Sequence, residues 1–136
     1  MAVLDSNVLL RYLTDDNADH AERALHLLQR IDAGERSVLL TEGVLIETVQ
    51  VLSSKRLYDL PREAIQVRLS EVIRMPGMRL GNKGTYLRAL ALFAAVTRLS
   101  IVDAILIAHA QREPDRAVIS FDNDFRNLRD VVWEQP

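Results

Sequence analysis

The fold follows from the opening stretch, Ala2-Val-Leu-Asp5-Ser-Asn-Val8-Leu-Leu-Arg-Tyr-Leu13. Its first three residues form a short apolar run, which is typical of a buried strand. From Val8 to Leu13, apolar residues recur with the spacing of one helix face. Asp5 therefore lies where a strand gives way to a helix.

The same alternation of short apolar runs and amphipathic segments continues along the chain. We expect further strands at 37–40, within 75–81, at 117–121 and at 131–133, and helices at 18–31, 42–57, 62–74, 86–99, 102–111 and, as a short turn, 124–128. Short strands that alternate with helices favour a mainly parallel sheet covered on both faces. We therefore predict a single α/β domain over residues 1–136, with three layers in the order α/β/α.

Composition narrows the class of protein. The 136 residues are 49% hydrophobic and 26% charged, as in an ordinary globular domain. The chain has no cysteine, which excludes a disulfide scaffold, a thiolate metal site and a cysteine nucleophile. We find neither a signal peptide nor an apolar stretch of the roughly 18–20 residues that span a bilayer, so we expect a cytoplasmic protein without a membrane partner.

The net charge is −2, which disfavours a protein that binds nucleic acid by phosphate neutralisation alone. If this chain acts on RNA, bound cations or a local basic patch must supply positive charge.

Acidic residues follow two of the expected strands. Asp5 follows the first, and Asp122 with Asp124 follows the strand at 117–121. In parallel α/β sheets, ligands bind at the carboxyl ends of the strands, and carboxylate oxygens suit Mg²⁺. Each acid also has a structural explanation, since Asp5 can cap the next helix and Asp122 can form an Asx turn.

Two further acids lie in expected helices. Glu47 lies in a largely apolar segment, with Gly43, Val44, Gln50 and Val51 three and four residues away on the helix. A carboxylate in apolar surroundings costs several kcal/mol unless it is paired or coordinated. The alternative is a narrow exposed stripe. Asp103 opens its helix, where it can serve as a cap. His109, within the same helix, is interpreted as structural.

Four segments together resemble the motifs of PIN-domain nucleases, especially the VapC-like toxins of prokaryotic toxin–antitoxin pairs. They are Val3-Leu-Asp5-Ser-Asn7, with Ser6 where threonine is common, and the segments 45–52, 102–108 and 119–125. The stretch from 57 to 86 matches no motif, and we expect it to carry specificity for a partner or substrate.

The resemblance implies a PIN-like fold and a metal-dependent endoribonuclease that cleaves RNA phosphodiesters with Mg²⁺ or Mn²⁺. The implied metal ligands are Asp5, Glu47, Asp103 and Asp122, with Asp124 beside them. Asp122 ranks before Asp124 because it lies nearer the strand end. The implied partners are RNA, a cognate antitoxin and a second copy of the chain in a homodimer. The candidate substrate contacts are Ser6, Asn7 and Ser120, with Arg11 or Arg126 on phosphate.

Three other interpretations compete with this one, of which a structural helical protein has little support because acids follow the apolar strands. A non-catalytic PIN-like domain would bind RNA or protein, but the four intact acids argue against it. A receiver-type phosphoryl-transfer domain would need a lysine after its later strands, whereas the last lysine here is Lys83.

Overall fold

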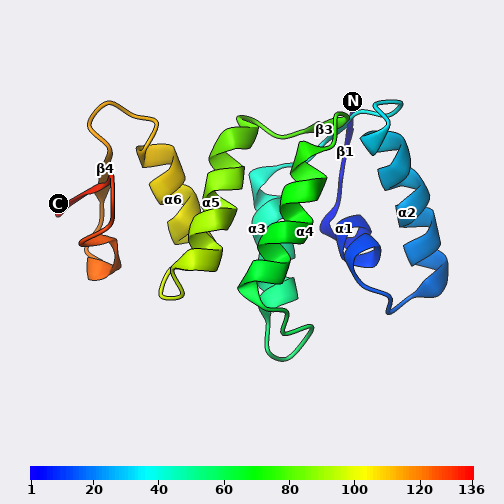
Figure 1. Cartoon of the computed structure of the whole chain (residues 1–136), viewed down its shortest axis with the longest axis horizontal. Coiled ribbons are helices and arrows are strands. Elements are labelled where there is room, and N and C mark those ends of the chain that lie inside the picture. The colour runs from blue at the N-terminus through cyan, green and yellow to red at the C-terminus, as the bar shows by residue number, and fades with distance from the viewer. The chain divides into compact units, whose positions relative to one another are not determined.

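The computed structural model describes residues 1–136 and divides into two compact units, residues 1–83 and 84–136. Figure 1 shows the helices and strands of both units, which follow one another along the chain in the predicted order. None of the helices combines the length and the apolar character that crossing a membrane requires.

The first unit contains a parallel sheet with strand order β1-β2-β3. Its strands are β1 (Ala2–Val3), β2 (Val38–Leu39) and β3 (Met78–Arg79). Val38 lies between Ala2 and Met78 in the register of the three strands. Because β1 is an edge strand of this sheet, Ala2 and Val3 are exposed, and the prediction of a buried strand was wrong there.

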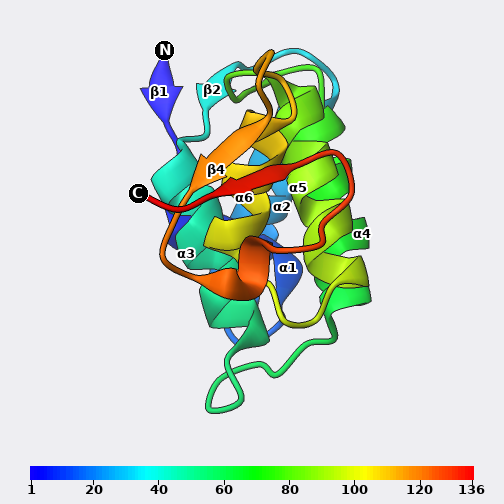
Figure 2. The ribbon, with the colours of Figure 1, turned by 90° about the vertical axis from the view of Figure 1, so that its left-hand side faces the viewer.

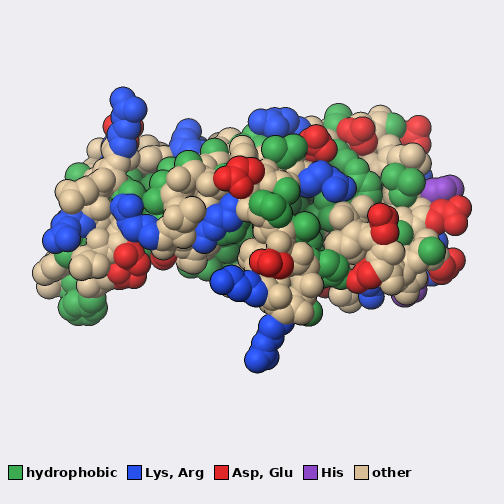
Figure 3. Space-filling view, turned by 60° about the horizontal axis from the view of Figure 1, so that its bottom comes forward, with side chains coloured by type: hydrophobic (Ala, Val, Ile, Leu, Met, Phe, Trp, Pro, Cys, Tyr) green, Lys and Arg blue, Asp and Glu red, His purple; other side chains and the backbone are tan.

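Four helices complete the first unit. They are α1 (Ser6–Leu13), α2 (Ala18–Asp32), α3 (Glu42–Ser53) and α4 (Arg62–Arg74). Helix α1 packs against α2 and α3, and α3 packs against α4. The core between them is built from fully buried aliphatic side chains, among them Leu9, Leu28, Leu45 and Leu69. On its outer face, α2 presents histidine and carboxylate side chains, which are visible in Figure 3.

Side-chain caps explain where several helices start. The Asn17 side chain accepts the His20 N–H at 3.0 Å before α2, and the Thr41 hydroxyl accepts the Val44 N–H at 3.3 Å before α3. Helix α3 ends at Ser53, four residues earlier than predicted, because the chain turns there. In this turn the Asp59 N–H bonds to the Ser54 carbonyl at 2.9 Å.

Gly77 lies where no side chain fits. A Cβ at this position would overlap the Arg36 carbonyl oxygen and come within 2.7 Å of the Ile31 carbonyl oxygen. The Gly77 N–H donates to Ile31 at 2.9 Å, and the Gly77 carbonyl accepts the Val38 N–H at 3.0 Å. The backbone therefore cannot move away without breaking the connection between α2 and the sheet.

We expect Gly77→Ala to lower the free energy of unfolding by about 3 kcal/mol, because the added methyl group meets fixed backbone. Gly43→Ala is the matched control, since a Cβ there meets nothing within 4 Å. Alanine is the better helix former, so the control should be neutral or stabilising by about 0.5 kcal/mol. Urea denaturation of both variants measures the difference, and equal destabilisation would contradict this account of Gly77.

The second unit begins at the second residue of α5 (Lys83–Ala95) and continues with α6 (Ile101–Ala110). Strands β4 (Ala117–Ile119) and β5 (Val132–Glu134) pair in parallel, with α6 packed against β4 (Figure 2). Helix α5 begins and ends three or four residues before its predicted limits. The short 3-10 helix η1 (Asn123–Phe125) follows β4.

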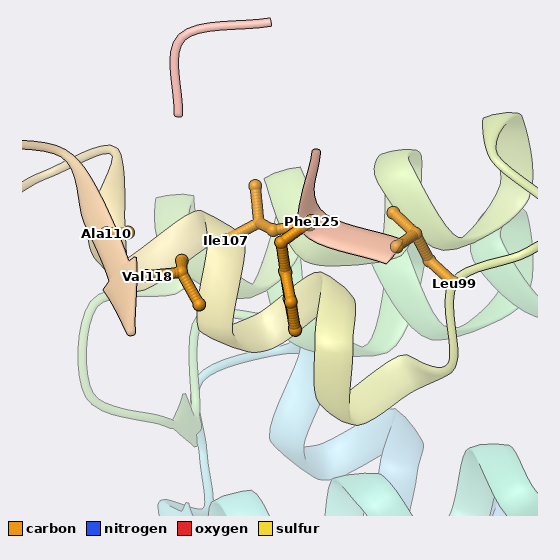
Figure 4. Close-up of a cluster of buried hydrophobic side chains, with 5 residues drawn as sticks. All are labelled: Leu99, Ile107, Ala110, Val118 and Phe125. Atoms are coloured by element: carbon orange, nitrogen blue, oxygen red, sulfur yellow. The ribbon is translucent and has the colours of Figure 1, made fainter. Parts of the chain in front are cut away.

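A compact apolar cluster holds the second unit together. Figure 4 shows it, and its buried members are Leu99, Ile107, Ala110, Val118 and Phe125. The chain segment that bears Asp122 and Asp124 leads directly into this cluster at Phe125, which is 3% exposed. Burial of this ring therefore anchors the acidic turn after β4.

Candidate metal centre and its surroundings

Asp5 follows β1, with Leu4 between them, and serves as the N-cap of α1. Its Oδ1 accepts the Ser6 N–H at 2.9 Å, and the carboxylate is exposed. The predicted capping role is thus present. A carboxylate has two oxygens, so a cap through Oδ1 leaves Oδ2 for a cation.

Glu47 lies in the middle of α3 and is exposed. The prediction of apolar surroundings for its carboxylate was wrong, and the alternative of a narrow exposed stripe is what the structure has. The reason is the phase of the helix, since α3 buries the face that carries Leu45, Val49 and Leu52, and Glu47 lies on the opposite side with Gln50. An exposed glutamate needs no ion to offset desolvation, but it is accessible to one.

Asp103 is half-buried in the first turn of α6 and forms a capping box with Ser100. The Ser100 hydroxyl accepts the Asp103 N–H at 3.1 Å, and Asp103 Oδ2 accepts the Ser100 N–H at 3.2 Å. The structural role that the sequence offered for Asp103 is therefore present. As with Asp5, the second carboxylate oxygen is not used by the cap.

Asp122 and Asp124 form an Asx-type turn after β4. Asp122 Oδ1 accepts the Asp124 N–H at 2.9 Å, and the Ser120 hydroxyl accepts the Asp122 N–H at 2.9 Å. The Ser120 carbonyl in turn accepts the Trp133 indole N–H at 2.9 Å. Both acids lie within one short turn, and Ser120 fixes its conformation.

The five acids are divided between the units. Asp5 and Glu47 belong to the first, and Asp103, Asp122 and Asp124 belong to the second. Within neither unit does a group of three or more histidine, aspartate or glutamate side chains gather in a way that could hold a metal ion. The metal-ligand set thus stays a prediction.

The other candidate contacts differ in exposure. Ser6 is 3% exposed, so its side chain belongs to the interior of the first unit. Asn7 is exposed and lines a groove between α1 and α2. His109 meets the Tyr86 ring edge to face, with ring centroids 5.9 Å apart, in line with its structural interpretation.

Arg11, in the last turn of α1, is held by a small polar network around Asp16 in the loop before α2. Its Nη1 donates to Asp16 Oδ1 at 2.6 Å, and the Tyr58 and Thr14 hydroxyls donate to the same carboxylate. Hydrogen bonds from Tyr58 and Arg11 lower the pKa of Asp16 to about 2. The network connects the α1–α2 loop to the loop after α3.

This shifted pKa predicts how stability depends on pH. The pKa of Asp16 is about 2 in the folded chain and about 3.9 when unfolded, so its ionised form favours folding. The contribution is complete above pH of about 4 and is lost as pH falls toward 2. We expect Asp16→Asn to lower the melting temperature at pH 7, with the gap to wild type closing near pH 2. Thermal melts across this range test it, and a constant gap would contradict the assignment.

Arg126 lies beside the acidic turn. Together with Arg98, Asn123, Asp124 and Asn127 it lines a hollow of about 340 Å³ in the second unit. The sequence indicated Arg126 but missed Arg98, Asn123 and Asn127, as it missed His20 and Arg23 in the groove between α1 and α2. Exposed polar residues on a helix or loop carry no sequence signal that separates them from ordinary solvated side chains.

The chain has an α/β fold with parallel strands, and Asp5 and Asp122 follow two of them. In folds of this class ligands bind outside the carboxyl ends of the strands. Residues 2–131 match the family model described as PIN domain. The chain belongs to the PIN-domain family. The match includes residues of both units and confirms the predicted fold class, the PIN-like α/β/α architecture with short parallel strands.

A relative supports the narrower resemblance. The chain is 26% identical to Ribonuclease VapC37 of Mycobacterium tuberculosis (strain ATCC 25618 / H37Rv) over 141 aligned positions, which cover 100% of this chain and 97% of the relative. The predicted resemblance to VapC-like PIN proteins is thereby confirmed.

Proposed function

We propose that this protein is a divalent-metal-dependent endoribonuclease and the toxin of a toxin–antitoxin pair. The observation that carries the proposal is the family match over residues 2–131 in a chain that has an acid in each of the four motifs. The likeness to a relative named as a ribonuclease supports the same reaction class.

The chemistry of the donor set fits a hard cation. The proposed ligands Asp5, Glu47, Asp103 and Asp122, with Asp124 beside them, offer only carboxylate oxygens. Mg²⁺ and Mn²⁺ prefer such oxygens, whereas zinc sites usually include histidine or cysteine. When bound, the ion supplies an activated water and stabilises charge on the phosphate oxygens.

The protein's own contribution is to hold these carboxylates in place. The caps at Asp5 and Asp103 fix each side chain through one oxygen, and the turn held by Ser120 fixes Asp122. Arg126, beside Asp124, can donate to a phosphate of the bound RNA. Preorganised groups of this kind lose little entropy when substrate binds.

The proposal is tested by incubating purified protein with RNA in Mg²⁺, in Mn²⁺ and in a chelator. We expect internal cleavage with either ion, none with the chelator, and recovery when ion is added back. RNA that stays intact under all conditions while it binds the protein would favour a non-catalytic PIN-like domain.

The proposal includes partners and a location. A cognate antitoxin protein would block the acidic site, a second copy would complete a homodimer, and the protein would act in the cytoplasm. Co-expression with a candidate antitoxin and light scattering of the purified chain test the first two. An unchanged cleavage rate in the antitoxin complex would contradict the toxin assignment.

A further inference from the structure

A groove of about 500 Å³ lies between α1 and α2 in the first unit, and none of the five proposed metal ligands lines it. Asn7 and Arg11 line it from α1, and His20 and Arg23 line it from α2. No carboxylate is among its lining residues. On a chain with a net charge of −2, this is a local surface with cationic and hydrogen-bonding side chains on both walls.

Apolar side chains complete the groove. They are Val8 from α1 and Ala24 and Leu27 from α2. Ala24 is 6% exposed, and its small side chain leaves room between the helices. A volume of about 500 Å³ suits a small organic group, and the combination of apolar surface with flanking cations suits a nucleotide.

The two arginines differ in how firmly they are held. Arg11 is bound to Asp16 at 2.6 Å, but a guanidinium has five N–H donors, so this contact orients Arg11 without exhausting it. Arg23 Nη1 lies 3.9 Å from Asp19 Oδ2, and the two side chains are 75% and 79% exposed. A pair this exposed contributes little energy, so Arg23 can exchange its carboxylate for a phosphate.

Asp5 caps the start of α1 and is not one of the lining residues, whereas Asn7 and Arg11 line the groove from that helix. Asn7 lies two residues after Asp5, and Arg11 lies one helical turn beyond Asn7, or about 6 Å along the axis. Residues four apart share a helix face, so an RNA strand lying in the groove along α1 would meet Asn7 and Arg11 in turn.

We infer that the α1–α2 groove binds the sugar–phosphate backbone and one unstacked base of single-stranded RNA beside the cleaved bond. Arg11 and Arg23 contact phosphate, and the base packs on Val8 and Leu27. The inference rests on the proposed function, because it assigns to the same reaction the surface that positions the substrate.

The test compares Arg23→Gln with Arg30→Gln, which removes an exposed arginine from the same helix outside the groove. Binding of a short fluorescein-labelled single-stranded RNA is measured in chelator between about 50 and 200 mM salt. One lost phosphate contact should weaken binding about eightfold at about 50 mM salt and reduce the slope of log K against log salt by about 0.7. Arg23→Lys should restore most of the slope, and in Mg²⁺ Arg23→Gln should raise KM without changing kcat.

The outcomes test RNA binding in the groove separately from nuclease activity. If Arg23→Gln has the same Kd, salt slope and KM as Arg30→Gln, the inference is overturned and the nuclease proposal stands. This result is expected if the groove docks a protein instead of RNA. Wild type that binds RNA through Arg23 in chelator but cleaves nothing in Mg²⁺ or Mn²⁺ would support the groove and overturn the nuclease. Failure of wild type to bind this RNA at all would overturn the inference.

Discussion

The Asp5→Asn variant is expected to lose about a thousandfold in RNA cleavage rate while it remains folded. Asparagine keeps an oxygen that can accept the Ser6 N–H, now 2.9 Å from Asp5 Oδ1, so the start of α1 survives. What is lost is the negative charge that would hold the ion. An ion at such a site is worth several kcal/mol in the transition state, and each 1.36 kcal/mol changes the rate tenfold.

The measurement is single-turnover cleavage at saturating Mg²⁺, with the melting temperature recorded for each protein. Asp32→Asn is the matched control, because Asp32 is an exposed acid in the same unit, at the last residue of α2. We expect the control to cleave at the wild-type rate. Full Mg²⁺-dependent cleavage by folded Asp5→Asn would remove Asp5 from the proposed metal site.

The sequence was sufficient for features that depend on neighbours along the chain. Asp5 and Asp122 follow strands β1 and β4 as predicted, because a short apolar run and the acid after it are adjacent residues. Helix α4 has its predicted bounds at Arg62 and Arg74, since Pro61 marks its start and a strict apolar spacing carries it on.

Features that depend on helix phase or on distant residues were not available from the sequence. Almost every residue around Glu47 is apolar, so the pattern does not indicate which side of α3 faces solvent. The network around Arg11 depends on Tyr58, which is 42 residues from Asp16 in the chain. The groove in the first unit arises because α1 packs on α2, and no spacing within either helix predicts it.

The carboxylate of Asp103 is assigned both a structural role, as a helix cap, and a catalytic role, as a metal ligand. Two variants of the capping box distinguish these roles. Ser100→Ala removes the hydroxyl that accepts the Asp103 N–H at 3.1 Å and leaves the carboxylate in place. Loss of this cap should lower the free energy of unfolding by about 1 kcal/mol and leave cleavage within about threefold of wild type.

Asp103→Asn should show the opposite pattern. Its amide oxygen can still accept the Ser100 N–H, which lies 3.2 Å from Asp103 Oδ2, so stability should change by only a few tenths of a kcal/mol. Cleavage should fall at least about a hundredfold, because the ligand charge is gone. The free energy of unfolding and the RNA cleavage rate of both variants show which role Asp103 has. If Ser100→Ala loses as much activity as Asp103→Asn, the box acts by positioning α6, and Asp103 is a structural residue.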